Sequence, residues 1–124
     1  ASSCYRLFFT WQENMSALLF GCHYDIEINP KNLNSAAMLL LEINSNLWMG
    51  HFEIARDTMA PSFRQTCLLR GQSENAGMDN IHDMVDIALG QCERFRHIFE
   101  ILAQEEVIAP ESLTLALMDT QGES

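Results

Sequence analysis

Two pairs of side chains in this sequence could share a metal ion. His82 and Asp86, and likewise Glu93 and His97, are four residues apart, so each pair lies on one face if its segment is helical. A zinc site needs three or four ligands, and the chain has neither an HExxH motif nor paired CxxC motifs to supply the others. We therefore predict no metal and no cofactor, and we interpret both pairs as local hydrogen bonds or ion pairs.

The four cysteines are the candidate nucleophiles. They occur singly, as Cys4, Cys22, Cys67 and Cys92, and the last three fall on apolar faces where a thiol is desolvated and inert. Nucleophilic catalysis also needs a neighbouring base and donors for the developing charge, which the sequence does not supply locally. We predict free thiols in a cytoplasmic protein, with no catalytic residue; a cryptic hydrolase ranks third among the functions that the sequence allows.

Trp48, His51 and Glu53 surround Gly50 at a predicted corner between a helix and a strand. One interpretation makes these three side chains a binding patch on an open sheet face. The other, which we favour, gives them a folding role: Trp48 closes the end of the core, Gly50 adopts a left-handed conformation, and His51 satisfies a backbone group.

The elements that would position these residues begin with a long helix over residues 77–103. Its predicted buried stripe consists of Met78, Ile81, Val85, Ala88, Cys92, Phe95, Phe99 and Leu102. A second apolar stripe on the same helix contains Met84, Ile87, Ile98 and Ile101. We predict that this second stripe is a dimer or partner surface; the alternative is that a C-terminal helix covers it.

The rest of the chain alternates between strand and helix patterns. Strands are predicted over 4–11 and 15–28, a helix over 29–48, two more strands around 52–54 and 63–69, and a short helix over 110–119. The order ββαββα plus a short α predicts an α+β fold, with a four-stranded antiparallel sheet covered by helices on one face. A length of 124 residues suits a single domain, 1–124.

Charge restricts the partners. The net charge is −10, and it is concentrated in the C-terminal half: residues 1–73 carry 5 basic and 6 acidic groups, residues 74–124 carry 2 and 11. Such a surface repels phosphate, so we predict that the protein binds neither nucleic acid nor an anionic membrane. The apolar runs at 17–20 and 36–41 are also too short to span a bilayer.

Three segments resemble the bacterial YbjN-domain family: Glu42–Glu53, with Phe63-Arg64 in the next strand, then Val85–Leu89 and Cys92–Phe95. Members of that family are proposed sensory-transduction regulators, and their fold is similar to that of type III secretion chaperones, which are small dimeric proteins that bind other proteins. Members often carry an additional N-terminal helix that this chain lacks.

The resemblance implies a non-enzymatic protein-interaction module, chaperone-like or regulatory, that forms a homodimer and binds an unknown protein partner. The alternative function is a small-molecule or cation sensor with a pocket between sheet and helix.

Overall fold

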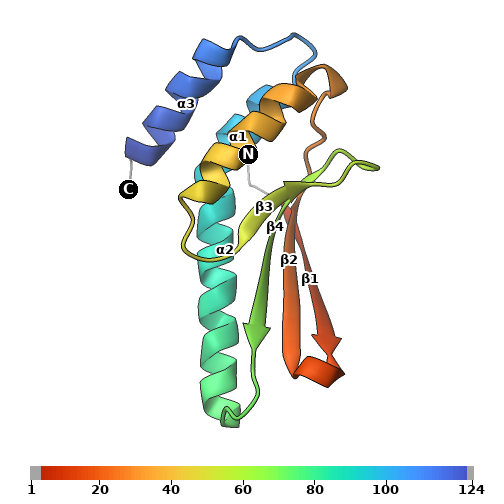
Figure 1. The fold of residues 1–124 in the computed structure, drawn as a ribbon, viewed down its shortest axis with the longest axis vertical. Helices are drawn as coiled ribbons and strands as arrows, with labels where there is room; N and C mark the ends of the chain where they lie inside the picture. Colours follow the sequence, from red (N-terminus) through yellow and green to blue (C-terminus); the bar gives the residue numbers. More distant parts are fainter. Residues whose placement is uncertain (1–3, 123–124) are drawn as a thin grey trace.

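The computed structural model describes residues 4–122, so the ends of the predicted 1–124 domain lie outside the described residues. The elements in chain order are β1 (Tyr5–Gln12), η1 (Glu13–Met15), β2 (Ala17–Tyr24), η2 (Pro30–Asn32), α1 (Leu33–Ser45), β3 (His51–Ile54), β4 (Pro61–Leu68), α2 (Glu74–Leu102) and α3 (Pro110–Gly122). This order confirms the predicted α+β fold (Figure 1).

The four strands form one antiparallel sheet in the order β1-β2-β4-β3. All eight residues of β1 pair with β2, from Tyr5 opposite Tyr24 to Gln12 opposite Ala17. The second hairpin joins the first through β2 and β4, with Phe63 opposite Cys22. The two edges of the sheet are therefore β1 and β3.

The inner face of the sheet carries the aromatic core. Phe52 of β3 is buried, and its ring centroid lies 5.2 Å from that of Phe63, 5.5 Å from Phe95 and 5.6 Å from Phe99. Offset and edge-to-face rings at these separations stabilise a core beyond the apolar area that they bury. α2 is thus held against the middle of the sheet by side chains that alternate along the strands.

The predicted buried stripe of α2 holds over its C-terminal half only. Ala88, Cys92, Phe95, Phe99 and Leu102 are buried, as the sequence predicts. Toward the N-terminus of the helix, however, Met78 is exposed, and Ile81 and Val85 are only half-buried. This part of α2 runs past the sheet beside β4 and has little apolar surface opposite it (Figure 1).

The helix after the first hairpin begins as predicted and ends earlier. Asn29 caps it by accepting a hydrogen bond from the Lys31 amide at 3.0 Å, and Pro30 fills the first helical position. The first turn is a 3-10 helix, and α1 ends at Ser45 instead of continuing to Trp48.

Asn32 fixes the connection from α2 to α3. Its buried side chain donates hydrogen bonds to the carbonyl oxygens of Leu102, Gln104 and Glu106 and accepts one from the Ile108 amide, at 3.1–3.3 Å. These four partners satisfy backbone groups that a loop following a helix would otherwise leave to water. α3 is thereby brought back alongside α2 and α1 (Figure 1).

Candidate functional site: the open edge of β1

The β1 strand exposes large apolar side chains on both of its faces. Leu7, Phe8, Phe9 and Trp11 are each between 41% and 49% exposed. Phe9 lies on the inner face beside buried Phe20, with the ring centroids 5.0 Å apart, whereas Phe8 lies on the outer face against His23 at 4.8 Å. β1 pairs only with β2 among the described strands, so its other edge presents unpaired backbone groups as well.

The position of the helices explains the exposure on the inner face. α2 packs on β4 and β2, and α1 packs on β3, so the described helices cover three strands and leave the β1 side of the sheet open (Figure 1). Only the first residue of β1 is drawn to the helix layer: Tyr5 donates a hydrogen bond to Glu93 of α2, and the Arg96 guanidinium lies 5.4 Å from its ring. From Arg6 to Gln12 every residue is exposed.

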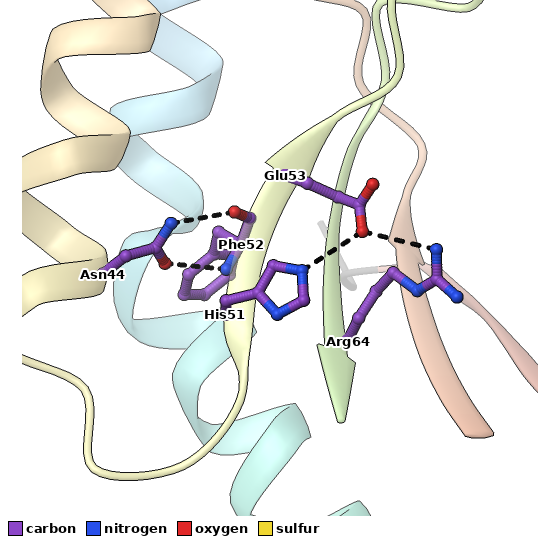
Figure 2. Close-up of polar contacts among 5 residues, drawn as sticks. All are labelled: Asn44, His51, Phe52, Glu53 and Arg64. Carbon is purple, nitrogen blue, oxygen red and sulfur yellow. Dashed lines mark hydrogen bonds and ion pairs between the residues drawn. The ribbon is translucent and has the colours of Figure 1, made fainter. Parts of the chain in front are cut away.

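The opposite edge of the sheet is capped. The Asn44 side chain of α1 accepts a hydrogen bond from the Phe52 amide at 2.8 Å and donates one to the Phe52 carbonyl at 3.0 Å, as Figure 2 shows. Its amide therefore replaces one residue of a neighbouring strand, and β3 is only four residues long. Short edges covered by a side chain resist pairing with another chain. The β3 edge is therefore protected, whereas the β1 edge is not.

The outer face of the sheet holds a small polar network. Glu53 of β3 lies 3.3 Å from the His51 ring nitrogen and 3.4 Å from the Arg64 guanidinium, and Figure 2 shows the three side chains pointing toward one another. They border a hollow of about 450 Å³. Because all three side chains are 40–55% exposed, water screens these ion pairs and each contributes little to stability.

A second histidine lies next to this network. Burial lowers the pKa of His23, and the positive charges of Arg64 and Arg6 lower it further, although the Glu53 carboxylate opposes them. This downward shift of the pKa from 6.5 favours the neutral form of the ring, which packs on Phe8. This part of the outer face carries two arginines and one glutamate, in a chain whose net charge is −10.

The structure brings together two of the three residues of the predicted patch. His51 and Glu53 share the outer face, whereas Trp48 lies in the connection from α1 to β3, is 77% exposed, and borders a different hollow with Met84 and Ile87. Trp48 therefore does not close the end of the core. Gly50 has φ +70°, which confirms the predicted left-handed corner.

The second stripe of α2 does not form one exposed surface. Met84 and Ile98 are buried in the core, whereas Ile87 and Ile101 are partly exposed. α2 contacts α3 as well as β4 and β2, so residues of both stripes join the core. A docking surface made of all four residues would require opening the core, and this part of the prediction is corrected.

The candidate metal pairs lie on the surface of α2. His82 and Asp86 form an ion pair at 3.7 Å, and both side chains are at least 70% exposed. Across residues 4–122 no group of three or more potential ligands is clustered closely enough to hold a metal ion. The four cysteines are free thiols: Cys22 and Cys92 are buried, Cys67 is half-buried and Cys4 is exposed.

Sequence reasoning missed the open edge. Alternation along the strand predicted over 4–11 puts Leu7, Phe9 and Trp11 on one apolar face, which would be expected to be buried, and the structure leaves all three largely exposed. The available signal was Phe8, which follows Leu7 and precedes Phe9, because a strand with apolar residues on both faces needs cover on both sides.

The fold and this edge define a small α+β domain with an unprotected strand. Residues 3–100 match the model of the YbjN family, whose description is "putative bacterial sensory transduction regulator". The chain therefore belongs to the YbjN family, and the matched range contains the whole sheet, α1 and nearly all of α2. No curated protein and no solved structure matches the chain. None of the helices in the described part is both long and apolar enough to cross a membrane.

Proposed function

We propose that this chain is a non-enzymatic, regulatory or chaperone-like protein-interaction domain that takes up an extended protein segment along the open edge of β1. The observation that carries this proposal is the exposure of Leu7, Phe8, Phe9 and Trp11 on an edge strand whose outer edge pairs with no other described strand. An added strand would pair with the free backbone groups and cover apolar side chains on both faces, which is the recognition mode called β-augmentation. The family description is consistent with a regulatory role.

The chemistry of the partner follows from the same strand. Its one charged residue is Arg6, and the remaining exposed positions are apolar or neutral. The preferred segment is therefore extended and largely apolar. The net charge of −10 argues against nucleic acid and anionic membranes as partners, and four free thiols support a reducing, cytoplasmic location.

A photo-crosslinking amino acid at Phe8, expressed in the source cells, tests this function. We expect adducts with a protein segment, and we expect them to disappear when Leu7→Lys and Trp11→Lys are added. The matched control is Met38→Lys with Leu41→Lys on α1, where two apolar residues that are each 68% exposed lie away from β1. Circular dichroism would verify that both double variants fold. No adduct at β1, or adducts that survive the β1 substitutions, would refute the proposal.

A second function has one observation in its favour. α1 and α3 enclose an apolar groove of about 430 Å³, bordered by Met38, Leu39, Leu113 and Leu117 among others. A groove of this size suits a small apolar ligand, so a small-molecule sensor is the second candidate. A ligand screen by thermal denaturation tests it: a binder should raise Tm, and the increase should shrink in Met118→Lys, which places a charge at an exposed position bordering the groove.

A further inference from the structure

We infer that the open edge of β1 pairs with β1 of a second copy of this chain, antiparallel and in a register centred on Phe9, to form a continuous eight-stranded sheet. This inference rests on the proposed role of β1 as the binding edge and names its occupant. The β1 edge is eight residues long and pairs with β2 without a bulge, so an uninterrupted edge is available to a second strand. At the β3 edge the Asn44 side chain already occupies the backbone groups of Phe52, so a second strand cannot pair with them.

The sequence of β1 is complementary to itself in this register. With Phe9 opposite Phe9 of the second copy, Leu7 lies opposite Trp11, so the exposed inner-face side chains form one apolar strip across the junction. On the outer face Phe8 lies opposite Thr10. A two-fold axis perpendicular to the sheet keeps inner residues with inner residues, which is the isologous geometry of a symmetric dimer.

Charge favours the same pairing. Arg6 lies opposite Gln12 of the second copy and next to Glu13, whose carboxylate accepts a hydrogen bond from the Trp11 indole at 3.0 Å. No like charges face each other in this register. β1 itself carries no acidic residue, so the strand-to-strand junction adds no contact between carboxylates of two chains that each carry −10.

The register centred on Phe8 would be less favourable. It would place Trp11 of one copy opposite Tyr5 of the other, and the Tyr5 side chain is already held by Glu93 and Arg96 of α2. Centring on Phe9 leaves Tyr5 at the end of the paired segment, opposite Glu13, where it keeps those contacts.

The size of the interface indicates a weak association. An aromatic side chain has about 150–250 Å² to bury, so four apolar side chains exposed by 41–49% offer about 400 Å² per copy. Adding the polar residues of β1 brings the total for two copies near the ~1,200 Å² lower limit of stable interfaces. We therefore expect a concentration-dependent dimer with a micromolar dissociation constant.

Analytical ultracentrifugation of the full chain tests the dimer. The wild type should move from monomer to dimer between about 1 and 100 μM, a micromolar range that is consistent with the interface area. Leu7→Lys with Trp11→Lys should weaken association by at least about tenfold, because both substitutions occur twice in the symmetric interface. Met38→Lys with Leu41→Lys should leave it unchanged. A monomer throughout this range, or equal effects of the two double variants, would overturn the inference.

Cysteine cross-linking tests the register, in a Cys4→Ser background that removes the exposed native thiol. Opposed residues of paired strands have Cβ atoms about 4.5–5.5 Å apart, close to what a disulfide needs. Phe9→Cys should therefore form a covalent dimer on mild oxidation, and Trp11→Cys, displaced by four residues from its copy, should not. Cross-linking through Phe8→Cys instead would overturn the register. Should β1 cross-link only to other proteins, the dimer is refuted and the proposed function stands.

Discussion

Replacing Gly50 by alanine tests how tightly the corner before β3 is built. Gly50 has φ +70°, a conformation that costs an alanine about 1–2 kcal/mol. A Cβ at this position would also overlap the ring of buried Phe63 and lie 2.9 Å from the Arg64 carbonyl oxygen. Relieving that overlap requires moving a core ring or the backbone of β4. Overpacking of this kind costs about 1–3 kcal/mol of stability. The expected loss is therefore about 2–5 kcal/mol.

Gly71→Ala is the matched control. Gly71 has φ +78°, but an added Cβ meets no atom within 4 Å, so this variant has the backbone cost without the clash. Both substitutions restrict the unfolded chain equally, so the difference between them isolates the clash, about 1–3 kcal/mol. Urea denaturation followed by circular dichroism measures both free energies of unfolding. Equal losses in the free energy of unfolding would show that Phe63 and β4 move aside without measurable cost, and would refute the account of a rigid corner.

Three further predictions concern stability and thiol chemistry. Asn32→Ala should lower the free energy of unfolding by about 2–4 kcal/mol, measured in urea, because four backbone groups lose their hydrogen bonds and two of those bonds are buried. The hydrogen bond from Arg96 lowers the pKa of Asp25, so its stabilising effect is complete above the ordinary value of 3.8 and is lost as the pH falls through the lowered folded pKa. Arg96→Gln should therefore reduce stability at neutral pH, and thermal melts should show the Tm difference between the two proteins shrinking as the pH falls and the Asp25 pairing is lost. A residual difference should remain, because the guanidinium also lies over the Tyr5 and Tyr24 rings and that contact does not titrate. A thiol reagent should modify Cys4 in the native protein at once, and buried Cys22 only at the rate of unfolding, as mass spectrometry of digests would show.

Local patterns were sufficient for the order of the elements. Apolar alternation in β1 and β2, the Asn29-Pro30 helix start and the three- and four-residue spacing along α2 are each properties of a short segment. Gly50 is a further case, because a left-handed corner after a helix is a local requirement that glycine meets. These predictions agree with the structure because the backbone preferences and the packing point to the same conformation.

Burial at the two margins of the domain could not be predicted in this way. Whether an apolar strand residue is covered depends on where the helices lie across the sheet, and that position is set by contacts between residues far apart in the chain. Asn32 illustrates the same difficulty: its side chain partners lie 70 or more residues away, so its own segment gives no sign that it is buried. Met84 is a similar case, since the residues beside it come from β4 and from the connection before β3.

The sequence by itself determined the α+β class, the ββαββα order and the family, because each is carried by local periodicity or by short segments in order. The tertiary structure alone decided which edge of the sheet is open. Helices α1 and α2 cover β3, β4 and β2, and Asn44 closes the β3 edge, so the apolar side chains of β1 are left uncovered. Exposure is a property of what lies opposite a residue in space, and alternation along a strand specifies only which residues share a face.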